Sequence, residues 1–475
     1  MRVWLVNPPT QGSRTPGING IVDTLFYNSP PLGLAYLAAV IEAEGHQVTI
    51  TDAPVERLDA RDVVGLGQTI KPDLIGLTAT TTYLTSALET ARGLRAVLPG
   101  AVIGLGGPHL SAHPGMLLEH PVLDFGVCGE GEQTFAELVA AVEASKPIDA
   151  IPGVVVVRDG RLQLAPPRPL IRDLDTLPMP ARHLLPLQRY RPLPNDQIRL
   201  PKTSLIVSRG CPFSCTFCDK STFGASYRAH SPQRVVTEMR EVSERWGVRD
   251  IAFVDSTFTP FPGRIEAVLD AMEAAPVPVT WTASCRADLL DRQLLARMRA
   301  AGCWRIRIAI ESGNREILHT IRKGITKEQF ASTVRVAKEQ GIQVKGFFML
   351  GHIGETVQTM AESIDFACSL PLDDVTVQIN TPLPGTQQYE VCRDHGELLE
   401  APPESTTFFE PLFLPTGLTR EQILEAHRCF YRSFYLRPRT VRRLVRDFRS
   451  PGDLRKYLRA VPAAVSLMFA NRGRG

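Results

Sequence analysis

The 475-residue sequence lacks a long hydrophobic run. Its longest late apolar stretch, 461–470, is about half the length that a bilayer span needs. The chain does not open on a positively charged segment followed by an apolar core and a cleavage site. The sequence therefore predicts neither a transmembrane helix nor a secretory signal.

Paired cysteines are also scarce. Six of the nine cysteines show no paired spacing: Cys128, Cys285, Cys303, Cys368, Cys392 and Cys429. Because secreted domains that depend on disulfides show such pairing, a reducing cytoplasm is the expected location. The composition, 44% hydrophobic and 22% charged, is that of a globular protein, and the length suits two to four domains.

Charge is distributed unevenly along the chain. Residues 421–475 contain 13 Lys and Arg against 4 Asp and Glu, a net charge of +9, whereas the whole chain has +3, which leaves −6 for the first 420 residues. A basic tail can contact an anionic membrane, but Arg-rich helices also occur simply as solvated faces. No separate DNA-reading helical domain is evident, so nucleic acid is not an expected partner.

Three of the nine cysteines are close together. Cys211, Cys215 and Cys218 follow the apolar run 205–207 with the spacing C-x3-C-x2-C. Chance would give only roughly 0.003 such triplets in a chain of this composition. Thiolate is the soft ligand that iron–sulfur clusters require, and three thiolates leave one iron of a [4Fe–4S] cluster open to a substrate.

The residues between these cysteines favour a cluster loop over a helix. Gly210 and Pro212 disfavour regular helix, and Phe213 and Phe217 provide apolar cover. A zinc site is the alternative, but zinc usually takes a fourth Cys or His nearby, and the next histidine, His230, lies twelve residues beyond the last cysteine.

This loop resembles the defining motif of the radical S-adenosylmethionine (SAM) superfamily. The three cysteines match the C-x3-C-x2-C pattern, and Phe217 matches the aromatic residue before the last cysteine. The resemblance implies that the open iron chelates the amino and carboxylate groups of SAM and that an external donor such as flavodoxin or ferredoxin supplies electrons.

Residues 1–145 alternate between strands and helices. Apolar strands are expected at 2–7, 47–51, 73–77, 101–105 and 123–127, with helices at 32–41, 86–98 and 133–144. This alternation predicts an α/β domain with a doubly wound parallel sheet, a Rossmann-like fold. Ligands of such sheets bind at the carboxyl ends of the strands, where glycine-rich turns occur.

These turns resemble those of the cobalamin-binding domain that precedes many radical SAM domains. The resemblance covers the Asn-Pro-Pro opening, the Gly-Gly-x-His turn and the Gly-Glu-Gly-Glu turn, and it implies cobalamin contacts from Asn7, Thr78, Thr80, Tyr83, Gly106, Gly107, His109, Gly129 and Glu130. No histidine has the Asp-x-His-x-x-Gly context that supplies an axial ligand in some cobalamin domains. The resemblance then points to the subgroup that binds cobalamin with neither its own base nor a histidine on cobalt; a degenerate domain that binds none is the alternative.

After a proline-rich linker at 146–200 with a small hairpin, the alternation resumes. Strands are expected at 205–207, 251–254, 279–285, 304–310, 344–350 and 375–380, with a helix after each of the first five strands. Six such strands predict a partial (β/α)6 barrel over 201–385, whose active site lies at the carboxyl ends of the strands. A helical, basic appendage is expected over 386–475, with a helix from 420 to about 436.

Polar residues at the expected strand ends resemble the nucleoside-binding positions of the superfamily. The resemblance assigns SAM contacts to Asp255, Ser284, Arg286, Glu311, Ser312 and Gly351. Oxygens at Asp255, Glu311 and Ser312 suit ribose hydroxyls and an ammonium group, while Gly313 and Gly351 would leave space for adenine. Each of these residues could instead cap a helix.

The combined resemblance implies a cobalamin-dependent radical SAM methyltransferase. It would methylate an unactivated carbon by means of a 5′-deoxyadenosyl radical and methylcobalamin. The Tyr-Leu-Arg-Pro sequence at 435–438 is similar to the family of hopanoid methylases and the anaerobic magnesium-porphyrin cyclase. A cyclase or rearrangement enzyme is the enzymatic alternative. A cobalamin-sensing regulator is the non-enzymatic one, although it would not need cluster thiolates. The sequence does not identify the small-molecule substrate, which could be a lipid or a natural-product intermediate.

Overall fold

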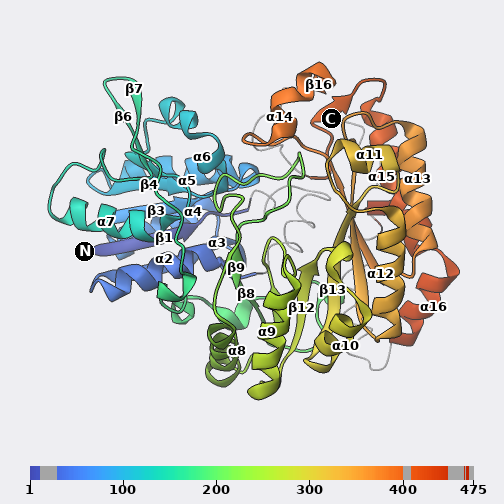
Figure 1. Cartoon of the computed structure of the whole chain (residues 1–475). Helices are drawn as coiled ribbons and strands as arrows, with labels where there is room; N and C mark the ends of the chain where they lie inside the picture. Colours follow the sequence, from blue (N-terminus) through green and yellow to red (C-terminus); the bar gives the residue numbers. More distant parts are fainter. Residues whose placement is uncertain (11–28, 400–407, 448–464, 466, 470–475) are drawn as a thin grey trace.

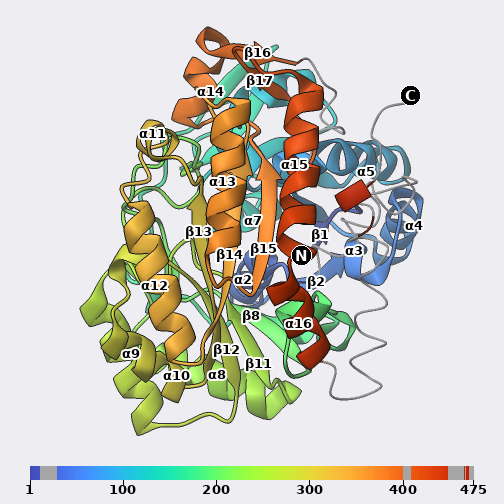
Figure 2. The same cartoon turned by 90° about the vertical axis from the view of Figure 1, so that its right-hand side faces the viewer.

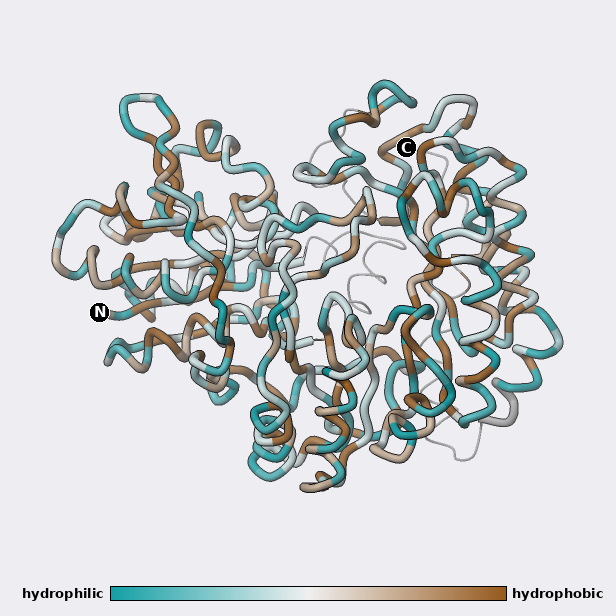
Figure 3. Tube along the Cα trace, viewed as in Figure 1, coloured by the Kyte–Doolittle hydropathy of each residue, from teal (hydrophilic) through white to brown (hydrophobic). Residues whose placement is uncertain are grey.

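A computed structural model of the chain describes residues 1–10, 29–399, 408–447, 465 and 467–469. Two α/β units lie side by side in it, each built on its own sheet (Figure 1). Hydrophobic stretches recur along the strands of both sheets (Figure 3). This arrangement confirms the predicted fold class, a Rossmann-like domain followed by a partial barrel.

The first sheet has the strand order β2-β1-β3-β4-β5-β6-β7, and its first five strands are parallel. Those five strands are β1 (Arg2–Asn7), β2 (Gln47–Asp52), β3 (Leu74–Thr78), β4 (Val102–Gly106) and β5 (Phe125–Val127). The chain order 2-1-3-4-5 is that of a doubly wound sheet, whose ligands bind where the strand order reverses.

Helices cover both faces of this sheet because its strands are apolar on both sides. Val3 and Leu5 of β1 face the core shared with α2 (Leu32–Ala43) and α7 (Gly131–Glu143), whereas Trp4 and Val6 face α4 (Ala60–Ile70) and α5 (Leu84–Val97). Three short helical segments follow strand ends on the ligand side: η2 (Thr81–Tyr83), α6 (Pro108–Ala112) and η3 (Pro114–Glu119). Helix α4 was not predicted from the sequence.

The segment 146–200 contributes to this sheet as well. Its hairpin, β6 (Val154–Arg158) and β7 (Arg161–Leu164), pairs antiparallel with β5 and extends the sheet. The hairpin was predicted, but its pairing with the first sheet was not, because antiparallel pairing to an edge strand leaves no periodic signature of its own.

The second sheet has the order β15-β14-β13-β12-β11-β8, all parallel. Its strands are β8 (Lys202–Leu205), β11 (Asp250–Phe253), β12 (Thr280–Cys285), β13 (Cys303–Glu311), β14 (Gln343–Leu350) and β15 (Asp374–Ile379). Its helices are α8 (Pro232–Trp246), α9 (Pro262–Ala274), α10 (Arg292–Ala300), α11 (Arg315–Thr320), α12 (Lys327–Glu339) and α13 (Val357–Ser369). Figure 2 shows α12 and α13 lying over the outer face of the strands.

The C-terminal appendage closes one edge of the barrel. It consists of α14 (Gln387–Val391), a two-stranded ribbon of β16 (Gly396–Leu398) and β17 (Phe413–Pro415), α15 (Arg420–Tyr435) and α16 (Pro438–Asp447). Phe430 and Phe434 of α15 are buried in the barrel core, as predicted, and the Tyr431 hydroxyl accepts a hydrogen bond from the backbone N–H of Val377. Within the described residues, no helix is both long and apolar enough to cross a membrane.

A short segment before β8 is attached to both units. The Tyr190 hydroxyl donates to Asp52 at the end of β2 over 2.7 Å. Only five residues later, the Asn195 amide donates to Asp374 of β15 over 2.7 Å, and Asp196 pairs with Arg305 of β13 at 3.1 Å. The two units are therefore joined by side-chain contacts on both sides of the connection.

Candidate active site

The three motif cysteines lie in an irregular loop between β9 (Ser208–Arg209) and β10 (Arg228–Ala229), which pair antiparallel and close the loop at its base. Gly210 has a φ of +78°, and a Cβ there would lie 2.1 Å from the Ser226 carbonyl oxygen, so this turn requires glycine. The Thr216 N–H donates to the Ile321 carbonyl over 3.1 Å, which ties the loop to the barrel rim.

The cysteine side chains suit a cluster better than a single ion. In the described part of the chain, no three His, Cys, Asp or Glu side chains are arranged to hold one metal ion, as zinc would require. In a four-iron cluster each thiolate binds a different iron, so the three sulfurs surround the cluster and do not share one ion. Burial raises the pKa of Cys215. Metal binding would have to stabilise these thiolates.

Aromatic rings of the same loop contact the barrel rim. Phe213 lies under the Arg286 guanidinium, 3.6 Å from its centre, and Arg286 also pairs with Asp288 at 3.0 Å. The ring centroid of Phe217 lies 5.9 Å from that of His352. The two phenylalanines predicted to cover the loop thus fix it against residues at the ends of β12 and β14.

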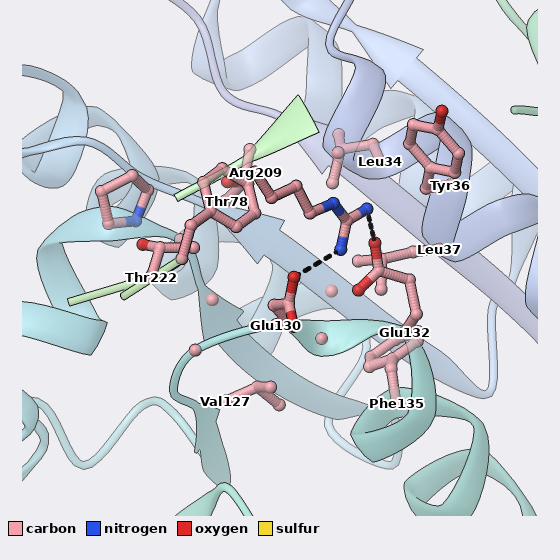
Figure 4. Close-up of a pocket in the computed structure, with 18 of the residues that line it drawn as sticks. Leu34, Tyr36, Leu37, Thr78, Val127, Glu130, Glu132, Phe135, Arg209 and Thr222 are labelled. Carbon is pink, nitrogen blue, oxygen red and sulfur yellow. Dashed lines mark hydrogen bonds and ion pairs between the residues drawn. The ribbon is translucent and has the colours of Figure 1, made fainter. Parts of the chain in front are cut away.

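A cavity of about 350 Å³ lies between the cysteine loop and the carboxyl ends of the first sheet (Figure 4). The loop side supplies Cys211, Cys218 and Lys220, and the barrel mouth supplies Ile206 and Ser256. The first domain supplies predicted site residues, namely Thr78, Gly106, Gly107, Gly129 and Glu130. One cavity therefore joins the two sets of motifs, which lie more than eighty residues apart in the sequence.

Two glycines lie at the centre of the floor of this cavity. Leu5, Gly76, Gly104 and Phe125 are cross-strand neighbours in one row of the sheet, and all four line the cavity. A Cβ at Gly104 would lie 2.1 Å from the Phe125 ring. Leu34, Leu37 and Phe135 of the covering helices also line the cavity. This row forms an apolar floor, called the glycine slot, in which the Phe125 ring lies over Gly104 and which borders the cavity.

Filling that slot is expected to weaken cobalamin binding. In Gly104→Val the side chain must displace Phe125 or occupy the slot, and such overpacking costs about 1–3 kcal/mol, or roughly ten- to a hundredfold in affinity. Cobalamin retained after gel filtration, measured by its absorbance, should fall accordingly. Gly100→Val is the matched control, because a Cβ at Gly100 meets open space. Equal cobalamin content in Gly104→Val and the wild type would contradict the assignment of the slot.

Four other residues of this domain were predicted to contact cobalamin but do not line the cavity in the described part of the chain: Asn7, Thr80, Tyr83 and His109. Asn7 donates to Asp52 over 2.8 Å, and the Thr80 and Thr82 hydroxyls are 2.9 Å apart. His109 contacts the Thr81 hydroxyl at 3.0 Å, and burial lowers its pKa to about 4, so it is neutral at physiological pH.

A buried ion-pair cluster links the two domains beside the cavity (Figure 4). Arg209 pairs with Glu130 at 2.9 Å and with Glu132 at 2.5 Å, while Arg228 pairs with Glu130 at 2.7 Å. The Arg209 guanidinium also lies over the ring of Tyr36, 5.4 Å from its centre. The predicted residue Glu130 thus uses its carboxylate to bind arginines. Arg209 precedes the Gly-Cys step directly, so this cluster fixes the start of the cysteine loop.

The predicted residues of the barrel gather along its rim, and most of them bind each other or their neighbours. Asp255 accepts from the Ser208 hydroxyl over 2.6 Å, and burial raises its pKa to about 6. Ser284 ends the interior row of β12 and is partly exposed. Glu311 has a φ of +69° and pairs with Lys323 at 3.0 Å.

Two further rim positions are held by helix α13 and its loop. The Ser312 hydroxyl is 3.0 Å from that of Ser363, and a Cβ at Gly313 would lie 2.6 Å from the Glu362 carbonyl oxygen. Gly313 therefore allows close packing of α13, and the expectation that it leaves space for adenine is wrong. The Gly351 N–H donates to Glu355 over 2.5 Å.

Sequence reasoning did not single out His352. This residue is fully buried, and neither ring nitrogen has a hydrogen-bond partner within the part of the chain that the structure describes. Burial lowers its pKa to about 3. Its position in the Gly351-x-x-Gly354 turn could have drawn attention to His352. A histidine in a turn is usually exposed, however, so the sequence does not show that this side chain is buried.

Comparison with known proteins gives consistent results for both units. Residues 205–367 match the model of the radical SAM superfamily, and residues 18–139 match that of the B12 binding domain. The chain is 35% identical over 443 residues to an uncharacterized methyltransferase of Pyrococcus horikoshii, covering 93% of this chain and 94% of that protein. It is 29% identical to the anaerobic magnesium-protoporphyrin IX monomethyl ester cyclase of Rubrivivax gelatinosus, covering 91% of this chain and 78% of the cyclase.

Solved structures share the fold at lower identity. The radical SAM methyltransferase TsrM from Kitasatospora setae, solved with cobalamin and a [4Fe–4S] cluster, superposes with a TM-score of 0.68 at 19% identity, covering 91% of this chain and 85% of TsrM. The cobalamin-dependent SAM radical enzyme OxsB, solved with aqua-cobalamin, gives a TM-score of 0.73 at 17% identity, covering 98% of this chain and 72% of OxsB. Both similarities extend over the two units and the appendage.

Proposed function

The chain belongs to the radical SAM superfamily, among the members that carry a B12-binding domain, and we propose that it transfers a methyl group to an unactivated carbon of a small molecule. One observation carries this proposal: a single cavity touches both the cysteine loop and the glycine turns of the cobalamin domain. A methyl donor and a radical source can therefore act on one substrate.

The side chains of the cavity fit both cofactors. Cys211 and Cys218 of the cavity, with Cys215 of the same loop, would provide three thiolates for a [4Fe–4S] cluster, and the glycine slot would border cobalamin. When bound, the cluster supplies the electron that cleaves SAM, and cobalamin supplies the methyl group. We also propose that an external flavodoxin or ferredoxin reduces the enzyme.

The chain itself contributes orientation and the exclusion of water. Asp255 and Arg286 hold the cysteine loop from the barrel side, while Glu130 and Glu132 of the first domain hold its start through Arg209. Apolar side chains such as Leu34 and Phe135 line the cavity and keep its walls dry. A dry, fixed site protects a reactive radical from side reactions, which is the service a protein adds to cofactor chemistry.

A cyclase is the second candidate, because the relatives include the magnesium-protoporphyrin cyclase at 29% identity. Isotope labelling separates the two reactions. The reconstituted enzyme is incubated without oxygen with reductant, with SAM deuterated at its methyl group, and with small-molecule extract from its native cells. Methyl transfer predicts a product that carries the deuterated methyl group, together with about one S-adenosylhomocysteine and one 5′-deoxyadenosine per turnover.

The same assay can reject the proposal. Consumption of an extract component with accumulation of 5′-deoxyadenosine, but without S-adenosylhomocysteine or label in the product, would establish the cyclase-type reaction instead. Omitting the reductant serves as the control, because cleavage of SAM at the cluster requires an electron.

We further propose that cobalt has no nitrogen ligand on its lower face. The sequence contains no Asp-x-His-x-x-Gly motif that would supply a histidine ligand. The ring of His109 instead contacts the Thr81 hydroxyl. Electron paramagnetic resonance of the cob(II)alamin form should therefore show no nitrogen superhyperfine splitting, and His109→Ala should leave the spectrum unchanged. A splitting that disappears in His109→Ala would identify that histidine as a ligand.

Location and membrane contact also remain proposals. All nine cysteines are free thiols, which suits a reducing cytoplasm. The basic tail could contact anionic lipids at low salt, since clustered arginines attract such surfaces. Helix α16 contains Arg439, Arg442 and Arg443, whereas most of the tail, 448–464 and 470–475, lies outside the described residues.

A further inference from the structure

The upper part of the concave face of the barrel sheet is only partly buried. Alternate residues of its strands face the helices and are fully buried, such as Ile306, Ile308 and Ile310 of β13. The residues between them face the interior, yet the upper ones are only partly buried. These are Ser284, Arg307, Ala309, Phe347, Met349 and Gln378. Solvent therefore reaches the upper interior of the barrel, and so could a small molecule.

The lower part of this concave face is closed by ion pairs. Lysines and arginines of the lower interior pair with carboxylates at normal distances: Lys202 with Asp250 at 3.1 Å, Lys345 with Asp374 at 3.2 Å and Arg305 with Asp196 at 3.1 Å. All these side chains except that of Asp196 are nearly inaccessible. The lower layer is thus electrostatically satisfied and leaves no room for a ligand.

Arg307 lies directly above this layer and differs from its neighbours. It forms no ion pair with any carboxylate of the described chain, and its only hydrogen bond there runs from Nη2 to the Phe253 carbonyl oxygen over 3.0 Å. Its Nε is buried and has no partner among these residues. A guanidinium can donate five hydrogen bonds, and this one is partly buried without an ion pair among the described residues. Burial lowers the pKa of Arg307, while the charges of Asp196 and Asp255 act in the opposite direction.

The position of Arg307 is close to the reaction site. Phe253 is the last residue of β11, so the guanidinium lies at the level of the barrel mouth. Three residues beyond Phe253, Ser256 lines the cavity beneath the cysteine loop. A group bound by Arg307 would hold the rest of its molecule within or next to that cavity.

We propose that Arg307 binds a carboxylate or phosphate group of the methyl acceptor, so that the substrate of this enzyme is an anion. That the bound anion is the methyl acceptor rests on the proposed function. Guanidinium matches both groups, because its planar fork donates two parallel hydrogen bonds to either. The carboxylate of SAM is the competing ligand, but the family resemblance assigns that group to the open iron.

Anion binding can be tested without turnover and without knowing the substrate. Acetate and inorganic phosphate serve as probes, added to the cluster-reconstituted full-length enzyme at constant ionic strength. The melting temperature of the wild type should rise in a saturable way with at least one probe. In Arg307→Gln the apparent affinity should fall about tenfold or more, since a charge-assisted bidentate contact is lost. Arg297→Gln is the control, because Arg297 lies on the outer helix α10 and pairs with Asp270 at 2.6 Å.

Two further measurements decide between the ligands. SAM binding, measured by equilibrium dialysis, should remain within about threefold of the wild type in Arg307→Gln and should not compete with the probe. A parallel loss of SAM affinity would assign Arg307 to the SAM carboxylate and overturn the proposal. An unchanged probe response in Arg307→Gln would overturn it as well.

Folding of the variants provides an independent readout. Without added anion, Arg307→Met should melt close to or above the temperature of the wild type, because Arg307 makes no ion pair whose loss would leave a carboxylate alone. A marked decrease would show that the charge is already compensated within the protein and would contradict the proposal. None of these outcomes depends on methyl transfer, so a negative labelling experiment would leave the anion site standing.

Discussion

Serine in place of Cys215 is expected to abolish the reductive cleavage of SAM. A serine oxygen is a hard ligand that stays protonated at neutral pH, whereas the cluster requires soft thiolate. Reconstituted wild-type protein should hold about four irons per chain, and the variant fewer. Formation of 5′-deoxyadenosine, followed by chromatography, should fall to the level seen without protein. The same result is expected for Cys211→Ser and Cys218→Ser.

Cys429→Ser is the matched control for this experiment. Cys429 lies on α15, where its thiol is 3.7 Å from the Ser433 hydroxyl, and it is remote in sequence from the motif. Iron content and SAM cleavage should therefore equal those of the wild type. Undiminished 5′-deoxyadenosine from any of the three loop variants would refute the cluster assignment.

Removal of the Arg209 side chain is expected to cause the largest loss of stability. In Arg209→Met, Glu132 loses the ion pair that it forms at 2.5 Å, although Glu130 keeps Arg228. A buried carboxylate left alone costs about 3–5 kcal/mol in the free energy of unfolding. The midpoint of guanidinium unfolding, followed by circular dichroism, should decrease, and less iron should be incorporated because the cysteine loop starts at this residue.

Two companion variants separate charge burial from simple loss of an arginine. Arg245→Met removes an exposed pair with Glu241 at 2.9 Å and should cost less than about 1 kcal/mol. The double variant Arg209→Met with Glu132→Met removes both charges and should recover much of the stability, since apolar replacement of a whole buried pair is often neutral. If Arg209→Met is as stable as the wild type, the buried ion pairs of Arg209 do not hold the two domains together.

The strands of both units could be predicted from the sequence because each is an apolar run between turn residues. Helix α4 was missed for a physical reason. It contains Gly65 and Gly67, which are poor helix formers, and Gly67 is required by packing: a Cβ there would lie 2.7 Å from the Leu94 side chain. Local propensity thus contradicts the structure at a point where α4 packs against α5.

The location of the site was also predictable, because parallel strands place their carboxyl ends at one edge. The roles of individual residues were less so. Glu130 was predicted to contact cobalamin, yet its carboxylate binds Arg209 across a sequence separation of 79 residues. No spacing rule connects such positions. Arg307 was overlooked for a related reason, since a missing counter-charge becomes visible only when all neighbours are placed.

The attachment of residues 190–196 to both units determines how the enzyme can work. Tyr190 is bonded to the first sheet and Asn195 to the barrel, and five residues of fully extended chain span at most about 18 Å. Neither unit can swing away from the other without breaking one of these bonds. A clamshell opening between half-reactions would therefore have to break one of these hydrogen bonds. We expect both steps to take place with the two units in contact, so that the component that travels in each catalytic cycle is the acceptor molecule.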